Sequence, residues 1–160
     1  MGLLESGQNY LENIYILQQK QGLVRSVDLA NAMGFSKPSV SRAVHLLADD
    51  GYLEFSDSGN LILTETGHKV AKNIYERHMF LAEYFMAMGV SEETAYDDAC
   101  RLEYHISEET MERLKLHTIN CALNCPKASS EKFFNFNKEK IQDLENFDPG
   151  KITALNDEQQ

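Results

Sequence analysis

The sequence predicts a mainly α-helical protein in which three short helices and a β-hairpin precede an all-helical second part. Apolar residues recur at helical spacing in three segments between residues 6 and 48. Two short strand-like runs then flank a Ser-Asp-Ser-Gly turn at 56–59, and a single apolar helix face follows from residue 64 to about 88. We therefore expect a first domain over residues 1–66, a helical domain over 67–126 and a C-terminal extension over 127–160.

The first two helices are delimited by serine and glycine. Ser6 is expected to cap the first helix, which ends near Gly22. Ser26 begins the second helix and Gly34 stops it, with Phe35 filling the turn that follows. The residues expected on the core faces are Tyr10, Leu11, Ile14, Tyr15 and Leu17 in the first helix, and Val27, Leu29, Ala30 and Met33 in the second.

The third helix has a polar front and an apolar back. Ser36 is a capping serine, and Pro38 lies in the first turn, where its missing N–H is harmless. The core positions are Val40, Val44 and Leu47, and the opposite side carries Lys37, Ser39, Ser41 and Arg42. Two short helices joined by a glycine turn form a helix-turn-helix, and the hairpin over 51–63 makes it the winged form, which places its third helix in the major groove of double-stranded DNA. We expect Ser39, Ser41 and Arg42 to reach base edges or nearby phosphates, and Lys37 to meet a phosphate.

Composition bounds the class of protein. No apolar run approaches the roughly 20 residues of a membrane-spanning helix, and the first residues lack the basic and apolar segments of a secretory signal. We therefore expect a cytoplasmic protein without membrane contact, whose three cysteines are reduced. The net charge of −10 is uneven, since residues 1–78 carry −2 and residues 79–160 carry −8. A basic face is thus compatible with the first part, while the acidity of the second either makes the protein soluble or attracts cations.

The second part of the sequence is predicted to form a domain of packed helices. The helix from residue 64 shows more apolar surface than one small domain needs to bury, which favours a homodimer. Ser91 and Ser107 each precede two glutamates and a threonine, the pattern of a capped helix start.

The chain resembles a known family over roughly residues 8–116. The matching segments are Tyr10 to Tyr15, Leu63 to Gly67, Glu76 to His78 and Asp97 to Glu103, in order and with similar spacing. They are similar to the diphtheria toxin repressor and manganese transport regulator family, homodimeric winged-helix repressors that respond to Fe(II), Mn(II) or related ions. The resemblance implies a metal-responsive transcriptional repressor of metal-homeostasis genes.

The resemblance also implies a metal site that joins three helices. Glu12 and His78 match a carboxylate and an imidazole ligand, and Cys100 and Glu103 match two more, with cysteine as in the iron-responsive branch. Independently, Cys100 and Glu103 are three residues apart on a helix and are expected to project to one side. A thiolate, carboxylates and an imidazole suit Fe(II), Zn(II), Co(II) or Ni(II) better than Mg(II), and Mn(II) is the ion of the second branch.

Three positions depart from the family pattern. Asn9 stands where the manganese branch has an aspartate, and Tyr104 stands where the family has a histidine. His105 is adjacent, but it lies about 140° around the helix from Cys100 and faces another way unless the helix is distorted. Tyr96 replaces a histidine of the iron-responsive branch. We keep Asn9 and His105 as candidate ligands, and the site is expected to be depleted, locally distorted or changed in its ion.

A second group of candidate ligands follows. His117, Cys121 and Cys125 share one helical face at intervals of four, with Pro126 ending the helix. They predict a second metal or redox site, although Cys-x3-Cys is not the usual zinc spacing. The alternative is that Cys125 and Pro126 are inherited from a Cys-Pro segment that many family members carry.

The extension over 127–160 is polar apart from scattered aromatic and aliphatic residues. Phe133, Phe134 and Phe136 are expected to pack against the body or a partner subunit, and residues 137–146 could form a short helix. Residues 143–151 resemble the start of the SH3-like domain of longer relatives. Only nine residues follow, so we expect the short form without that domain.

These observations predict a DNA-binding regulator whose affinity for an operator is set by a divalent metal ion. One alternative is a winged-helix regulator that responds to thiol oxidation or a small ligand through its cysteines. The other is a metal-binding interaction module without DNA binding. We expect no enzyme, because the sequence has no phosphate-binding glycine loop, nucleophile elbow or HExxH motif.

Overall fold

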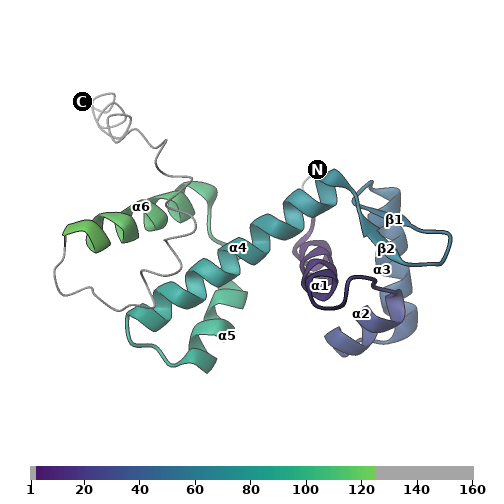
Figure 1. Ribbon diagram of the computed structural model, residues 1–160, viewed down its shortest axis with the longest axis horizontal. Helices are drawn as coiled ribbons and strands as arrows, with labels where there is room; N and C mark the ends of the chain where they lie inside the picture. Colours follow the sequence, from purple (N-terminus) through teal and green to yellow (C-terminus); the bar gives the residue numbers. More distant parts are fainter. Residues whose placement is uncertain (1–2, 125–160) are drawn as a thin grey trace. The chain divides into compact units, whose positions relative to one another are not determined.

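A computed structural model describes residues 3–124 of the chain. They contain α1 (Glu5–Gln21), α2 (Ser26–Met33), α3 (Lys37–Asp49), β1 (Leu53–Phe55), β2 (Leu61–Leu63), α4 (Glu65–Ala87), α5 (Glu92–Leu102) and α6 (Glu108–Asn124). The chain divides into two compact units, residues 1–107 and 108–160. The first unit therefore holds the expected winged helix-turn-helix together with α4 and α5, and the mainly α-helical fold class is confirmed (Figure 1).

The helix ends of the reader, α1 to α3 with the hairpin, follow the local sequence. Gly22 closes α1, and Gly34 closes α2 in the left-handed conformation at φ 68°. The Ser36 hydroxyl accepts a hydrogen bond from the Ser39 amide at the start of α3, with Pro38 in the first turn. Each of these termini matches the sequence prediction, because capping is decided by residues within one turn of the end.

The wing is a two-stranded antiparallel hairpin. Leu53 pairs with Leu63, and Phe55 pairs with Leu61. At its base, an isolated bridge joins Arg25 to Asn60, and the guanidinium Nε of Arg25 donates to the Asn60 side chain at 3.4 Å. The hairpin is thereby attached to the segment between α1 and α2 as well as to α3.

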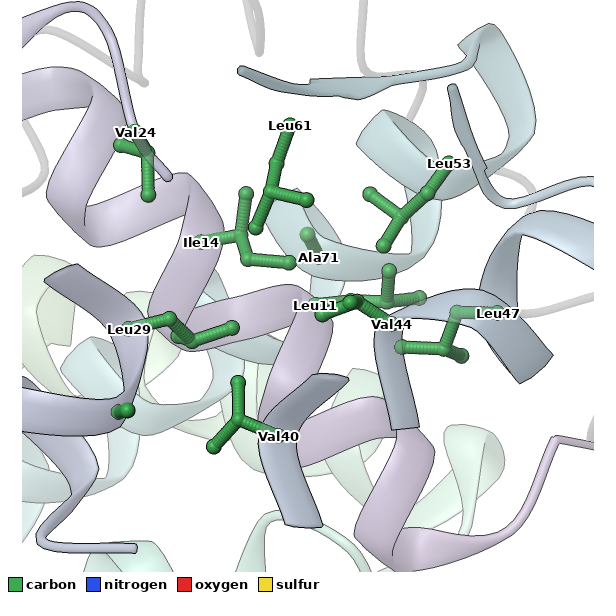
Figure 2. Close-up of a cluster of buried hydrophobic side chains, with 11 residues drawn as sticks. Leu11, Ile14, Val24, Leu29, Val40, Val44, Leu47, Leu53, Leu61 and Ala71 are labelled. Atoms are coloured by element: carbon green, nitrogen blue, oxygen red, sulfur yellow. The ribbon is translucent and has the colours of Figure 1, made fainter. Parts of the chain in front are cut away.

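One apolar core holds the reader together. Side chains from all three helices and both strands meet in it, as Figure 2 shows. Its buried members are Leu11, Ile14, Val24, Leu29, Ala30, Val40, Val44, Leu47, Leu53, Leu61 and Ala71. Ala71 belongs to α4, so the core also fixes the first turns of the long helix to the reader.

Two core expectations and one cap are wrong. Val27 is 39% exposed, because Leu29, Ala30 and Met33 define a helix face that leaves Val27 outside at about 100° per residue. Phe35 is 48% exposed, and its ring lies against Tyr10 instead of filling the turn. α1 begins at Glu5 after Leu4, which supplies no side-chain cap, so Ser6 lies inside the first turn.

The long helix α4 links the reader to α5. Thr64 caps it by accepting a hydrogen bond from the Gly67 amide, and α4 packs along α1 and then along α5 (Figure 1). Gly67 lies so close to the Tyr52 carbonyl that a β-carbon there would collide with the oxygen. Ser91 caps α5 as expected, accepting from the Thr94 amide.

In the second unit, α6 begins directly after Ser107 with two acidic residues in its first turn. The expectations for Cys125, the three phenylalanines and the helix over 137–146 lie outside the described residues. Within residues 3–124, none of the helices is both long and apolar enough to cross a membrane.

Candidate metal centre

Three helices of the first unit bring two carboxylates and an imidazole together. Glu12 lies on α1, His78 on α4 and Glu103 at the end of α5, and one ligand atom from each lies within 4.8 Å of the others. Glu12 is 5% exposed and Glu103 is 1% exposed. In the part of the chain that the structure describes, this is the group of potential ligands that could hold one cation.

The local structure explains how Glu103 is aimed. It is the C-cap residue of α5, and the following turn is closed by the amides of His105 and Ile106, which donate to the Leu102 carbonyl. Arg77 on α4 donates from Nη1 to the carbonyls of Glu103 at 3.0 Å and Ile106 at 3.1 Å. The turn is thus attached to the helix that carries His78.

Hydrogen bonds orient the side chains of the group. The His78 Nδ1 lies 2.7 Å from Glu103 Oε2, and the Tyr104 hydroxyl donates to Glu12 Oε2 at 3.0 Å. The Tyr96 ring lies beside the His78 imidazole, with centroids 5.6 Å apart. Each of the three candidate ligands therefore has a neighbour that restricts its rotation.

The electrostatics of the group are those of crowded acids. Burial, followed by the charge of Glu103, raises the pKa of Glu12 to about 7. The hydrogen bond to Glu103 raises the pKa of His78, against the effect of its burial. Burial and the charges of Glu12 and Glu103 raise the pKa of the Tyr104 phenol strongly, so this hydroxyl stays protonated. In the metal-free protein, protons on Glu12 and His78 therefore supply part of the positive charge that a bound cation would provide.

The residues present fit a divalent transition metal. Glu103 Oε1 is buried and has no hydrogen-bond partner, which is costly for a carboxylate oxygen without a cation. Two carboxylates balance the charge of a divalent ion, and one imidazole favours a transition metal over Mg(II).

The remaining candidate ligands of this site are Cys100, Asn9 and His105, and neither Cys100 nor His105 belongs to the group of three. Cys100 is exposed and is not among the three grouped residues, and its thiol pKa is raised by partial burial and then by the charges of Glu103 and Glu12. The Asn9 side chain accepts a hydrogen bond from Asn13 Nδ2 at 2.7 Å. His105 Nε2 lies 3.9 Å from Glu5 Oε2, and both side chains are exposed.

The other predicted sites are only partly described. His117 lies on α6 and is exposed, but the Cys121 side chain and Cys125 lie outside the described residues. The candidate DNA-binding residues Lys37, Ser39, Ser41 and Arg42 are all exposed on α3. His45, on the same helix, lies against Phe55 of the wing.

Sequence reasoning missed two residues at the metal centre. Arg77 lies in the matching segment around His78, but its bonds to two carbonyls have no sequence signal. The sequence marks Tyr104 as a departure from the family pattern and indicates no partner for it. Its proximity to Glu12, 92 positions earlier in the chain, depends on how α1 and α5 pack on α4.

Comparison with known proteins agrees with this arrangement. Residues 2–61 match the model of the iron dependent repressor N-terminal DNA binding domain, and residues 64–129 match that of the iron dependent repressor metal binding and dimerisation domain. Among curated relatives, the HTH-type transcriptional regulator MntR of Bacillus pumilus is 36% identical over 109 residues, covering 68% of this chain and 76% of that protein. The transcriptional regulator MntR of Escherichia coli O157:H7 is 36% identical over 110 residues, covering 69% of this chain and 71% of that protein.

Solved structures show the same fold. The manganese regulator SloR superposes with a TM-score of 0.62 at 25% identity, covering 76% of this chain and 54% of that one. A manganese-dependent transcriptional repressor in complex with manganese gives 0.63 at 27% identity, covering 69% and 51%. The chain thus spans about half the length of these solved relatives. By its two family models and its curated relatives, the chain belongs to the iron-dependent repressors, transcriptional regulators that join a DNA-binding domain to a metal-binding and dimerisation domain.

Proposed function

We propose that this protein is a homodimeric repressor whose affinity for operator DNA is set by one divalent metal ion per chain, held by Glu12, His78 and Glu103. The convergence of these three side chains from three helices, with their ligand atoms within 4.8 Å, carries the proposal. Glu12 belongs to the reader itself, so the centre links the DNA-binding part to α4 and α5.

The donor set favours an ion that accepts both carboxylate and imidazole. Fe(II) and Mn(II) meet this condition, and the similar structures include a manganese regulator and a repressor bound to manganese. Zn(II), Co(II) and Ni(II) are the alternatives. Cys100 is outside the group of three, so the ligand set has no thiolate and a larger share of oxygen ligands than the set predicted from the sequence. This composition favours Mn(II) or Fe(II) over the softer ions.

The proposed mechanism is a linkage between the centre and the reader. The buried carboxylates of Glu12 and Glu103 repel each other, and this repulsion opposes the approach of α1 to the end of α5. A bound cation supplies the positive charge that cancels it. Glu12 then holds α1 in place, so the two readers of a dimer keep a separation of about 34 Å, one turn of DNA.

The other parts of the proposal follow from the fold. Ser39, Ser41 and Arg42 face the major groove and Lys37 meets a phosphate, because all four are exposed on α3. We assign the DNA-binding domain to residues 1–66, the dimerisation and metal-binding domain to 67–126 and an extension to 127–160. A repressor acts in the compartment that holds its DNA, so we place the protein in the cytoplasm. As a transcriptional regulator, it is assigned no catalytic activity.

The test measures metal content and DNA binding together. Protein purified anaerobically should bind one Mn(II) or Fe(II) per chain, while Glu12→Gln and His78→Ala should lose about 100-fold or more in affinity because each removes a ligand. His68→Ala, on the same helix but outside the group, is the matched control and should bind as the wild type.

DNA binding is measured by fluorescence anisotropy on a duplex selected from a random library in the presence of Mn(II). A chelator should weaken binding by the wild type and by His68→Ala, and it should change nothing in His78→Ala. If the wild type bound the duplex with equal affinity in the presence of metal and of chelator, the proposal that metal controls DNA binding would be wrong. If Cys100→Ser alone then abolished a response to peroxide, the thiol-based regulator would replace the proposal.

A further inference from the structure

The turn over residues 103–106 holds its shape through bonds to α4 and α5. Its amides bond back to the Leu102 carbonyl at the end of α5, and Arg77 on α4 donates to the carbonyls of its first and last residues, Glu103 and Ile106. Because the Arg77 side chain bonds to two carbonyls of the turn, it fixes the position of the turn along α4. Besides Glu103, which belongs to the group of three, the side chains of this turn that reach α1 are those of Tyr104 and His105.

Tyr104 makes the closer contact with α1. Its hydroxyl donates to Glu12 Oε2 at 3.0 Å, and Glu12 is almost fully buried. His105 reaches Glu5 on the same helix at 3.9 Å, but both of these side chains are exposed, and a pair of this kind contributes little in water. The connection between the turn and the reader thus passes mainly through Tyr104.

The chemistry of the phenol suits a donor and not a ligand. A phenol offers one O–H donor, and this hydroxyl lies 3.0 Å from Glu12 Oε2. By donating to Glu12 Oε2, this hydroxyl restricts the rotation of the carboxylate. Hydrogen bonds of this kind to a metal-binding carboxylate are typically worth 10- to 100-fold in metal affinity.

We propose that Tyr104 is a positioning residue that holds Glu12 at the metal centre, so that metal occupancy and the placement of α1 change together. The inference rests on the proposed metal site and adds a residue that is not itself a ligand. Tyr104 and Arg77 then form one path from α4 to the reader, in which Arg77 fixes the turn and Tyr104 joins it to Glu12.

Tyr104→Phe tests this path because it deletes the hydroxyl and keeps the ring. In the full chain, Mn(II) affinity measured by the EPR signal of the free ion should fall about 10- to 100-fold. At saturating Mn(II), hydrogen exchange should show less protection of the α1 amides than in the wild type, with α5 unchanged. Tyr75→Phe is the matched control, since Tyr75 contacts Tyr15 of α1 through its ring, which this change keeps.

A second variant separates the hydrogen bond from packing. Tyr104→His restores a polar group that can donate to Glu12 or ligate the ion, and it should recover the affinity that Tyr104→Phe loses. A loss in Tyr104→His with no loss in Tyr104→Phe would show that only the six-membered ring matters and would overturn the inference. So would wild-type or tighter Mn(II) binding by a folded Tyr104→Phe.

The outcomes distinguish this inference from the metal site itself. If Glu12→Gln and His78→Ala bind Mn(II) as the wild type does, the site is wrong; if they lose binding while Tyr104→Phe keeps it, only the role of Tyr104 is wrong. Should Tyr104→Phe fail to fold, hydrogen exchange on the wild type decides. Protection of residues 103–106 and of α1 must then rise over the same range of Mn(II) concentration, and separate ranges would contradict the coupling.

Discussion

In the metal-free protein, Glu12 and His78 each hold a proton more tightly than they would in an unfolded chain. The pKa of Glu12 rises from 4.5 to about 7, mainly because the carboxylate is buried, and the pKa of His78 rises above 6.5 through its bond to Glu103. A group with a raised pKa in the folded state contributes stability at low pH and loses that contribution as the pH rises through the folded value. Both groups therefore make the metal-free protein less stable at pH 8 than at pH 6.

This prediction is checked by thermal unfolding in the presence of a chelator. The unfolding temperature of the wild type should be a few degrees higher at pH 6 than at pH 8, since about 1 kcal/mol shifts a domain of this size by roughly 4 °C. Glu12→Gln should reduce the difference, because the amide does not titrate. Glu54→Gln, an exposed carboxylate on β1, should leave the difference unchanged. Equal curves for the wild type and Glu12→Gln would contradict the burial of this charge.

The individual residues of the centre were only partly predictable from the sequence. The matching segments pointed to Glu12, His78 and Glu103, and the structure brings these three together. Helical spacing predicts that Cys100 and Glu103 project to one side; the charge of Glu103 does act on the Cys100 thiol, but Cys100 is exposed and lies outside the group of three. Glu103 keeps a helical backbone, so the difference in burial depends on which neighbouring helices cover each position, and the spacing within α5 does not carry that information.

At the scale of elements, the contact between α4 and the hairpin depends on one glycine. Gly67 lies in the first turn of α4, directly against the Tyr52 carbonyl, and the Thr64 amide donates to that same oxygen at 3.1 Å. A methyl group at residue 67 would collide with backbone, which cannot rotate away as a side chain can. Gly67→Ala should therefore destabilise the protein despite the higher helix propensity of alanine.

The expected cost is about 1–3 kcal/mol, as for overpacked core positions. It is measured as the shift of the urea midpoint, with far-ultraviolet circular dichroism to check the helix content. Lys72→Ala, one and a half turns further along α4 and exposed, should stay within about 0.5 kcal/mol of the wild type. A neutral or stabilising Gly67→Ala would mean that α4 and the hairpin are further apart than the structure has them.

The ends of the helices were more predictable from the sequence than the surfaces against which the helices pack. Gly22, Gly34, Ser36, Thr64 and Ser91 each mark a helix end through contacts within one turn, and the sequence alone was enough to place them or to bring them within a residue. The burial of Val27 and Phe35 was predicted wrongly, because it depends on which surfaces the other helices cover. Local sequence carries no information about those surfaces.

At the scale of the whole molecule, the distribution of charge poses a problem for DNA binding. The formal net charge is −10, and residues 79–160 carry −8 of it, so the long-range field repels phosphate. The proposed DNA-binding face has only Lys37 and Arg42 as cations on the exposed side of α3. Local contacts at this face must therefore outweigh an unfavourable overall field.

Two arginine variants separate the local contact from the overall field. Arg42→Ala and Arg101→Ala each lower the formal charge by one, but Arg42 is exposed on α3 and Arg101 is exposed on α5. With Mn(II) present and the selected duplex as probe, Arg42→Ala should weaken binding about tenfold or more, and if it contacts a phosphate the slope of log affinity against log salt should fall by about 1. Arg101→Ala should change affinity by less than about twofold at 0.15 M salt, where the Debye length is about 8 Å. Equal losses in the two variants would mean that the net charge of the molecule governs binding, and that α3 does not meet the DNA with the face proposed.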